Sequence, residues 1–139
     1  MSIYIKKIIQ PEGDKCLCQV VHEGRDIDCF VYGSAEVLAP QLLEEIQIEI
    51  EFEKVLEAEA IPEFMDSKSG IKQSEGEPAH IIEGRVHSTL MAESDIYDIY
   101  IQNGPEFLCV TSDEWALKPN IGDGVRVKIS GLCFYPTNT

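Results

Sequence analysis

Residues 46–53, with the sequence IQIEIEFE, alternate apolar and polar side chains without interruption. Successive side chains of a β-strand point to opposite faces of its sheet, so this period of two is typical of a strand with one buried face. The apolar members are expected to face a core: Ile46, Ile48, Ile50 and Phe52. The polar members are expected to face solvent, about 7 Å apart along the strand: Gln47, Glu49, Glu51 and Glu53.

The polar face of this strand brings like charges together, and these repel one another. The row therefore has two interpretations: a solubilising surface, or a contact for a positively charged partner. The whole chain shares its sign, with 25 acidic and 11 basic side chains and a formal net charge of −14. A negative field disfavours docking on a phosphate backbone or an anionic membrane, and it attracts basic partners.

The length of 139 residues suits one ordinary domain or two small units that share a core, and 44% hydrophobic residues is a globular composition. The five cysteines are odd in number, and their spacing is not that of a secreted disulfide framework. No apolar run approaches 18 residues, and the first residues lack the apolar core of a signal peptide. We therefore expect a soluble protein of the cytoplasm.

Period-two patterns and turn signals predict an almost entirely β chain. The expected strands cover residues 3–9, 16–22, 26–32, 45–56, 79–87, 95–102, 106–111 and 124–134. Two short helical turns are expected at 34–39, with Ser34 as the N-cap, and at 112–117. Residues 62–78 are polar and rich in Gly, Ser and Pro, which predicts a loop or linker.

The two halves follow the same order of predicted elements, and glycine, cysteine, serine and proline residues occur at matching positions in both. Gly24 precedes Cys29 by five residues and Gly104 precedes Cys109 by five, while Ser34 and Pro40 are matched by Ser112 and Pro119. This series predicts an internal duplication: a first β unit at 1–61, a linker at 62–78 and a second β unit at 79–139.

The second half also resembles an OB-fold. Residues 82–86 (IEGRV) are similar to its curved first strand, and residues 121–131 (IGDGVRVKISG) are similar to a Gly-Asp-x-Val-x-Val-x-Gly stretch common in such barrels. The resemblance implies a small curved barrel and no particular ligand, and each half shows four strands where an OB-fold has five. The predicted fold is all-β, with two repeated four-stranded OB-like or meander units forming a pseudo-symmetric barrel or sandwich.

No local pattern predicts catalysis, a cofactor or a metal site. Cys16, Cys18, His22 and Cys29 lack the tight knuckle from which zinc is usually bound, and we expect Cys29 and Cys109 in the core instead. No nucleophile elbow, phosphate loop or calcium loop occurs. We therefore expect a protein that is not an enzyme, although a site assembled from distant residues would leave no local pattern.

The first functional hypothesis is a non-catalytic interaction protein whose acidic face binds a basic protein, for example an immunity or inhibitor protein. Its expected contacts are Glu44, Glu45, Glu49, Glu51, Glu53 and Glu57. The second hypothesis is an OB-like module that stacks single-stranded nucleic acid or an oligosaccharide on aromatic side chains. Its expected contacts are Tyr97, Tyr100 and Trp115. The excess of acidic residues makes nucleic acid the less favoured ligand.

The duplication also offers an internal partner for the acidic row. Alignment of Ile46 with Val125 places Gln47 and Glu49 opposite Arg126 and Lys128. The two strand faces are therefore complementary in charge. They could pair within one chain across a pseudo-twofold axis, or between two subunits of a homodimer.

Overall fold

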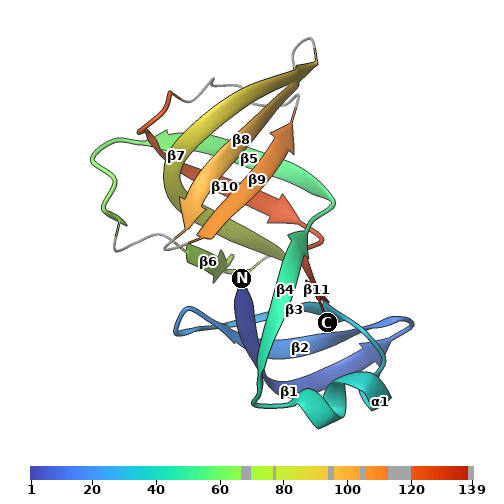
Figure 1. Ribbon diagram of the computed structural model, residues 1–139. Helices are drawn as coiled ribbons and strands as arrows, with labels where there is room; N and C mark the ends of the chain where they lie inside the picture. Colours follow the sequence, from blue (N-terminus) through green and yellow to red (C-terminus); the bar gives the residue numbers. More distant parts are fainter. Residues whose placement is uncertain (67–69, 77, 94–95, 104–105, 113–119, 138–139) are drawn as a thin grey trace. The chain divides into compact units, whose positions relative to one another are not determined.

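The computed structural model describes residues 1–66, 70–76, 78–93, 96–103, 106–112 and 120–137, with the backbone alone at 91–93, 96–98, 103, 106–108 and 110–112. The chain is all-β, as the sequence predicts. It divides into two compact units (Figure 1): Met1–Glu53 with Gly131–Thr139, and Lys54–Ser130. We call them the first and second units.

The first unit is a closed five-stranded barrel. Its strands lie in the order β1-β2-β3-β11-β4, and β11 runs parallel to β3 and antiparallel to β4. A last strand inserted between the third and fourth is the arrangement of an OB-fold barrel. The strands are β1 (Ser2–Glu12), β2 (Lys15–His22), β3 (Arg25–Tyr32), β4 (Glu45–Glu51) and β11 (Cys133–Pro136).

A short helical segment joins β3 to β4, where the sequence predicted a turn. Helix α1 (Ala35–Leu38) is followed by a 3-10 turn, η1 (Ala39–Gln41). The Ser34 hydroxyl accepts a hydrogen bond from the backbone N–H of Val37 at 3.3 Å, so the predicted N-cap is confirmed. Leu38 is buried and ties the segment to the barrel.

The alternation in residues 46–53 is confirmed only over part of its length. Ile46 and Ile48 are each 4% exposed and belong to the core, whereas Ile50 and Phe52 are half-buried. The predicted strand 45–56 is in fact two strands, because β4 ends at Glu51 and β5 (Lys54–Ile61) begins after Glu53 and belongs to the second unit. Period-two alternation carries no mark of the point where a strand leaves its sheet.

The second unit is a six-stranded sheet. Its order is β5-β10-β7-β8-β9, with β6 paired to β7. Strand β6 lies within the predicted loop 62–78, so that loop prediction is wrong in part. The strands not yet given are β6 (Gly70–Gln73), β7 (Ala79–Glu93), β8 (Ile96–Asn103), β9 (Glu106–Ser112) and β10 (Gly124–Ser130).

The predicted strand 124–134 is also two strands. It breaks at Gly131 and Leu132, where Gly131 adopts a φ of +70° that disfavours other residues. The break sends β10 into the second unit and β11 into the first. The predicted helical turn at 112–117 begins at the last residue of β9 and otherwise lies outside the described residues.

The two units interleave in sequence, whereas the predicted ranges 1–61 and 79–139 are consecutive. Strand β10 pairs with β7 and β5, much as β4 pairs with β1 and β11. The final strand of each predicted half therefore completes the unit built from the other half. The exchanged strands are β5, which joins the second unit, and β11, which joins the first. Two copies of an OB-like unit that had swapped their last strands would show this arrangement, and the duplication itself stays a prediction.

The cysteines divide into a buried group and an exposed one. Cys16, Cys18, Cys29 and Cys133 are buried in the first unit, which confirms the prediction for Cys29. Cys109 is exposed, so its predicted place in the core is wrong. It lies on β9, the last strand in the order of the second sheet, which among the described strands pairs with β8 alone.

The helical segments within the described residues span at most four residues, and none is long and apolar enough to cross a membrane.

We predict that the thiols react in two classes. Burial raises the pKa of Cys18 to about 12 and also raises the pKa of Cys16, Cys29 and Cys133. Because the thiolate is the reactive species, a disulfide reagent at pH 8 should modify Cys109 at least about tenfold faster than the others. All five thiols should react quickly in guanidinium chloride. The Cys109→Ser variant should lose the fast phase, and a fast native reaction that persists in it would contradict the described core.

Candidate functional site

The acidic row predicted from the sequence lies on the outer face of β4. We define the acidic row as Glu45, Glu49 and Glu51, which are all exposed, together with Gln47 between them. The residues between these positions point inward, which fixes the outward direction of the row. Because β4 is held by β1 on one side and β11 on the other, the row is presented by a closed barrel rather than by a loop.

Two further predicted contacts flank the row. Glu44 precedes β4 and is exposed, and its backbone N–H donates to the carbonyl of Gln41 at 3.2 Å. Glu53 follows β4 and is exposed, and its side chain lies across Gly131, where an added Cβ would collide with the Glu53 Cγ. Both carboxylates therefore belong to the first unit but not to the strand row.

The sixth predicted contact, Glu57, lies on β5 in the second unit. Its carboxylate is 3.9 Å from the ammonium of Lys128 on β10. The neighbouring outward residue of β5, Glu59, accepts a hydrogen bond from Arg126 at 3.0 Å. Glu57 therefore does not belong to the row on β4, and it lies near a cation of its own sheet, Lys128.

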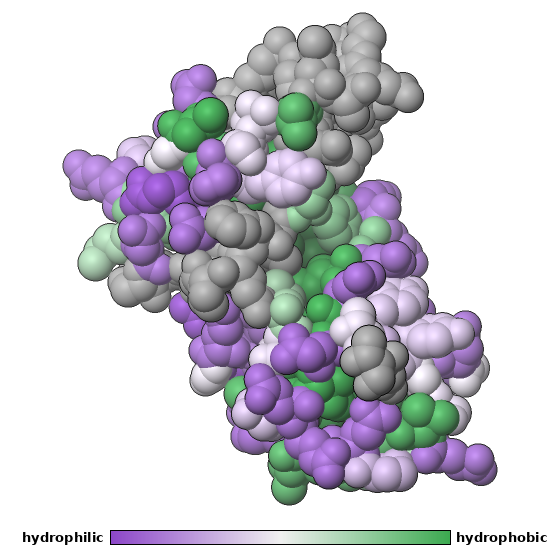
Figure 2. All heavy atoms as spheres, in the orientation of Figure 1, coloured by the Kyte–Doolittle hydropathy of each residue, from purple (hydrophilic) through white to green (hydrophobic). Residues whose placement is uncertain are grey.

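No such cation is described beside the acidic row. Within the described part of the chain, Glu45, Glu49 and Glu51 make no ion pair, and neither do Glu44 and Glu53. Hydrophilic residues are widespread on the described surface in the view of Figure 2, so exposure alone does not distinguish this row. What distinguishes the row is that none of the described ion pairs includes one of its carboxylates.

The intrachain pairing of Gln47 and Glu49 with Arg126 and Lys128 is wrong. Strand β10 lies between β5 and β7, and β4 lies between β1 and β11, so these strands have other neighbours. Arg126 and Lys128 instead face the glutamates of their own sheet. The alignment correctly identified the outward faces of the two strands but not which strands lie beside each other.

Tyrosines border the acidic row, and the sequence analysis missed them. Tyr135 on β11 is opposite Glu49 in the strand register, and Tyr4 on β1 is opposite Glu45. The Tyr135 ring stacks on Tyr32 of β3, with centroids 5.2 Å apart and planes at 21°. Tyr4 and Tyr32 are 43% and 45% exposed. The outward parity of Tyr32 was readable from the sequence, but its contact with Tyr135 depends on where β11 inserts.

The aromatic residues predicted for stacking lie in the second unit. Tyr100 on β8 is half-buried. Tyr97 is on the same strand, but its side chain lies outside the described part, and so does Trp115 altogether. Apart from Tyr100, this predicted stacking site therefore lies outside the described side chains.

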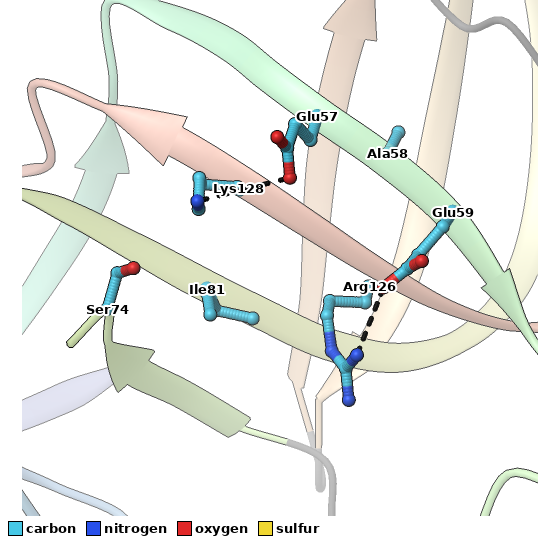
Figure 3. Close-up of a pocket in the computed structure, with 7 residues that line it drawn as sticks. All are labelled: Glu57, Ala58, Glu59, Ser74, Ile81, Arg126 and Lys128. Carbon is cyan, nitrogen blue, oxygen red and sulfur yellow. Dashed lines mark hydrogen bonds and ion pairs between the residues drawn. The ribbon is translucent and has the colours of Figure 1, made fainter. Parts of the chain in front are cut away.

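The second unit has a pocket of about 460 Å³ on the outer face of its sheet (Figure 3). Glu57 and Glu59 on β5 face Lys128 and Arg126 on β10 across it, as the dashed lines in the figure mark. The other lining residues are Ala58, Ser74 and Ile81. The two carboxylates and two cations compensate each other, so the pocket has little net charge with which to attract an ion.

One buried carboxylate, that of Glu83, contacts two cations of this charged face. The side chain of Glu83 on β7 is 5% exposed, forms an ion pair with Lys72 on β6, and lies 3.6 Å from Arg126. Buried carboxylates are costly unless paired, and two cations meet that requirement here. Glu83 was missed from the sequence because its burial depends on partners from β6 and β10, which only the sheet order reveals.

No group of three or more His, Cys, Asp or Glu side chains within the described ranges is arranged to hold a metal ion. Comparison with protein-family models, with curated proteins and with solved structures gives no match to this chain.

We predict that Glu83 stabilises the second unit. Glu83→Gln should lower the free energy of unfolding by about 1–3 kcal/mol, because Lys72 and Arg126 lose a charged partner that is held out of water. Glu59→Gln is the matched control, since its side chain is 60% exposed and such pairs contribute at most about 1 kcal/mol. Denaturant unfolding measures both, and equal effects of the two substitutions would contradict a special role for Glu83.

Proposed function

We propose that this protein is a non-catalytic, cytoplasmic interaction module that binds a basic protein through the acidic row of its first unit. The observation that carries the proposal is the difference between two glutamate pairs of the same spacing. Glu57 and Glu59 on β5 face cations of their own sheet, whereas Glu49 and Glu51 on β4 have no described counter-charge. Carboxylates left without counter-charge on a rigid strand are suited to receive the charges of a partner.

The geometry of the row supports recognition of an extended basic segment. Alternate residues of a strand are about 7 Å apart, and alternate side chains of an extended partner have the same repeat. Lysines or arginines at every second position could therefore each meet one carboxylate. Such charge complementarity contributes more to association rate and specificity than to affinity.

The bordering tyrosines would supply the affinity that charge alone does not. Tyrosine and arginine are enriched among the residues that dominate binding energy at interfaces. The exposed rings of Tyr4 and Tyr32 can receive cations over their faces, a contact that contributes about 0.5–1 kcal/mol at exposed sites. An immunity or inhibitor protein that neutralises a cationic toxin or nuclease is the concrete form of this function.

We predict that reversing two charges on β4 weakens capture of the partner. Lysate from the native host should yield a basic protein that binds the chain at low ionic strength and is released near 0.5 M salt, because surface charge interactions are screened. Glu49→Lys/Glu51→Lys should reduce the association rate at least about tenfold in a surface-binding assay with the purified partner.

The matched control is Glu57→Lys/Glu59→Lys, which makes the same change of net charge at the same spacing. It should affect binding much less, once both variants are shown to be folded by their melting curves. Equal losses in the two variants would mean that net charge alone drives binding. A captured second copy of this chain would favour the homodimer that the complementary strand faces predict, in place of a foreign partner.

The alternative function is an OB-like module for single-stranded nucleic acid or an oligosaccharide. It is supported by the OB-like barrel and by the stacked pair Tyr32 and Tyr135, since exposed rings stack bases and sugars. The acidic surroundings favour a neutral sugar over a nucleic acid.

Fluorescence of Trp115, the only tryptophan in the sequence, tests the form of this alternative in which Tyr97, Tyr100 and Trp115 stack the ligand. If the acidic row is the site, titration with a 12-nucleotide single strand or with neutral oligosaccharides should change the emission by less than about 5%. Saturable quenching that is abolished by Tyr97→Ala or Tyr100→Ala would instead support stacking in the second unit.

A further inference from the structure

A second pocket, of about 410 Å³, lies at the helical edge of the first unit. It is formed where the β1–β2 turn, the end of β3, helix α1 and the end of β11 come together. The residues that carry the argument are Asp14, Tyr32, Ser34, Val37, Gln41 and Pro136.

The walls of this pocket are largely apolar. Val37 is 53% exposed and Tyr32 is 45% exposed, so both offer their side chains to whatever enters. Pro136 is half-buried at the end of β11. A flexible aliphatic stem would cover these side chains, and a flat group could lie over the Tyr32 ring.

The one ionised side chain that lines the pocket is a carboxylate, that of Asp14. Within the described residues, Asp14 makes no ion pair. The Ser34 hydroxyl already accepts from the Val37 N–H, and the Gln41 Nε2 donates to the Val37 carbonyl at 3.1 Å. The Gln41 amide keeps a second N–H and its carbonyl oxygen, and Ser34 keeps its hydroxyl proton, so among these groups the Asp14 carboxylate alone is restricted to accepting. The pocket thus combines an apolar wall and an aromatic ring with a carboxylate, and it calls for a cationic donor.

We propose that this pocket receives an arginine side chain of the basic partner, an inference that rests on the proposed function. The methylene stem lies on Val37 and Pro136, and the planar guanidinium lies over Tyr32 within reach of the Asp14 carboxylate. Arginine fits better than lysine because its guanidinium stacks on an aromatic face and is more weakly hydrated than an ammonium.

The pocket and the acidic row belong to one surface of the barrel. Tyr32 in the pocket stacks on Tyr135, which is opposite Glu49, and Pro136 is opposite Ile48. Strands β3 and β4 both flank β11, so two strand spacings, about 10 Å, separate them. Three residues of a nearly extended segment span about 10 Å. Side chains at positions i and i+3 of a regular strand point to opposite faces, so a segment with basic residues there reaches both places only when glycines between them let the backbone twist and turn both side chains to one side.

One cation opposes this arrangement. Lys15 is opposite Tyr32 in the strand register, and its ammonium lies 4.3 Å from the centroid of the Phe30 ring. It lies beside the pocket and repels an incoming guanidinium. Removal of this charge should therefore strengthen binding, which a purely structural role of Lys15 would not produce.

The test is a titration of the isotope-labelled full chain with short capped peptides at low ionic strength, followed by backbone amide shifts. The probes are Arg-Gly-Gly-Arg, Lys-Gly-Gly-Lys and Gln-Gly-Gly-Arg. The first should bind several-fold tighter than the other two and should shift the amides of Gly33, Ser34 and Val37. Asp14→Asn and Tyr32→Ala should each weaken it about two- to fivefold, and Lys15→Gln should tighten it.

The outcomes separate this inference from the proposed function. Suppose that the arginine and lysine peptides bind equally, that Asp14→Asn has no effect, and that Glu49→Gln/Glu51→Gln weakens both peptides. The pocket then does not bind the arginine side chain, whereas the proposed binding by the acidic row is supported. If neither the pocket variants nor the row variant changes binding, both fail. Asp14→Asn retains the size of the side chain, so it remains informative if Tyr32→Ala fails to fold.

Discussion

The first unit depends on backbone pairing of β11 between β3 and β4. Residues 133–136 come from the far end of the chain, yet their ladder closes the barrel and leaves β4 with a neighbour on each side. Phe134, which is fully buried, reaches the core through this strand. The same insertion places Tyr135 next to Glu49 and against Tyr32, so the proposed binding surface exists only when the barrel is closed.

Charge is treated differently in the two units, and this difference supports the functional proposal. In the second unit, cations of β6 and β10 meet glutamates of β5 and β7, including the buried Glu83. In the first unit, the glutamates of β4 have no described counterpart, although a lysine or arginine at a neighbouring outward position would have supplied one. Repulsion along such a row costs stability, and a basic partner would remove that cost.

Local patterns predicted the local structure well. The β2–β3 hairpin, the Ser34 cap and the outward direction of Glu49 and Glu51 all follow from spacing and turn residues over a few positions. The breaks at Phe52 and Gly131 were missed because the patterns on either side were joined into one strand, although alternation stops at the consecutive charges of Glu53 and Lys54 and at Gly131. Cross-strand partners, such as the cations around Glu83 or Tyr135 beside Tyr32, depend on sheet order between segments far apart in sequence, which no local pattern contains.

The central claim is that the acidic row of β4 contacts a basic partner, and amide shift mapping of the full chain with that partner tests it most directly. The account predicts that the perturbed amides belong to the first unit and centre on Glu45, Glu49, Glu51 and Tyr135, and that they return toward their unbound positions as salt is added. Perturbations confined to residues 54–130, or unchanged by salt, would contradict it.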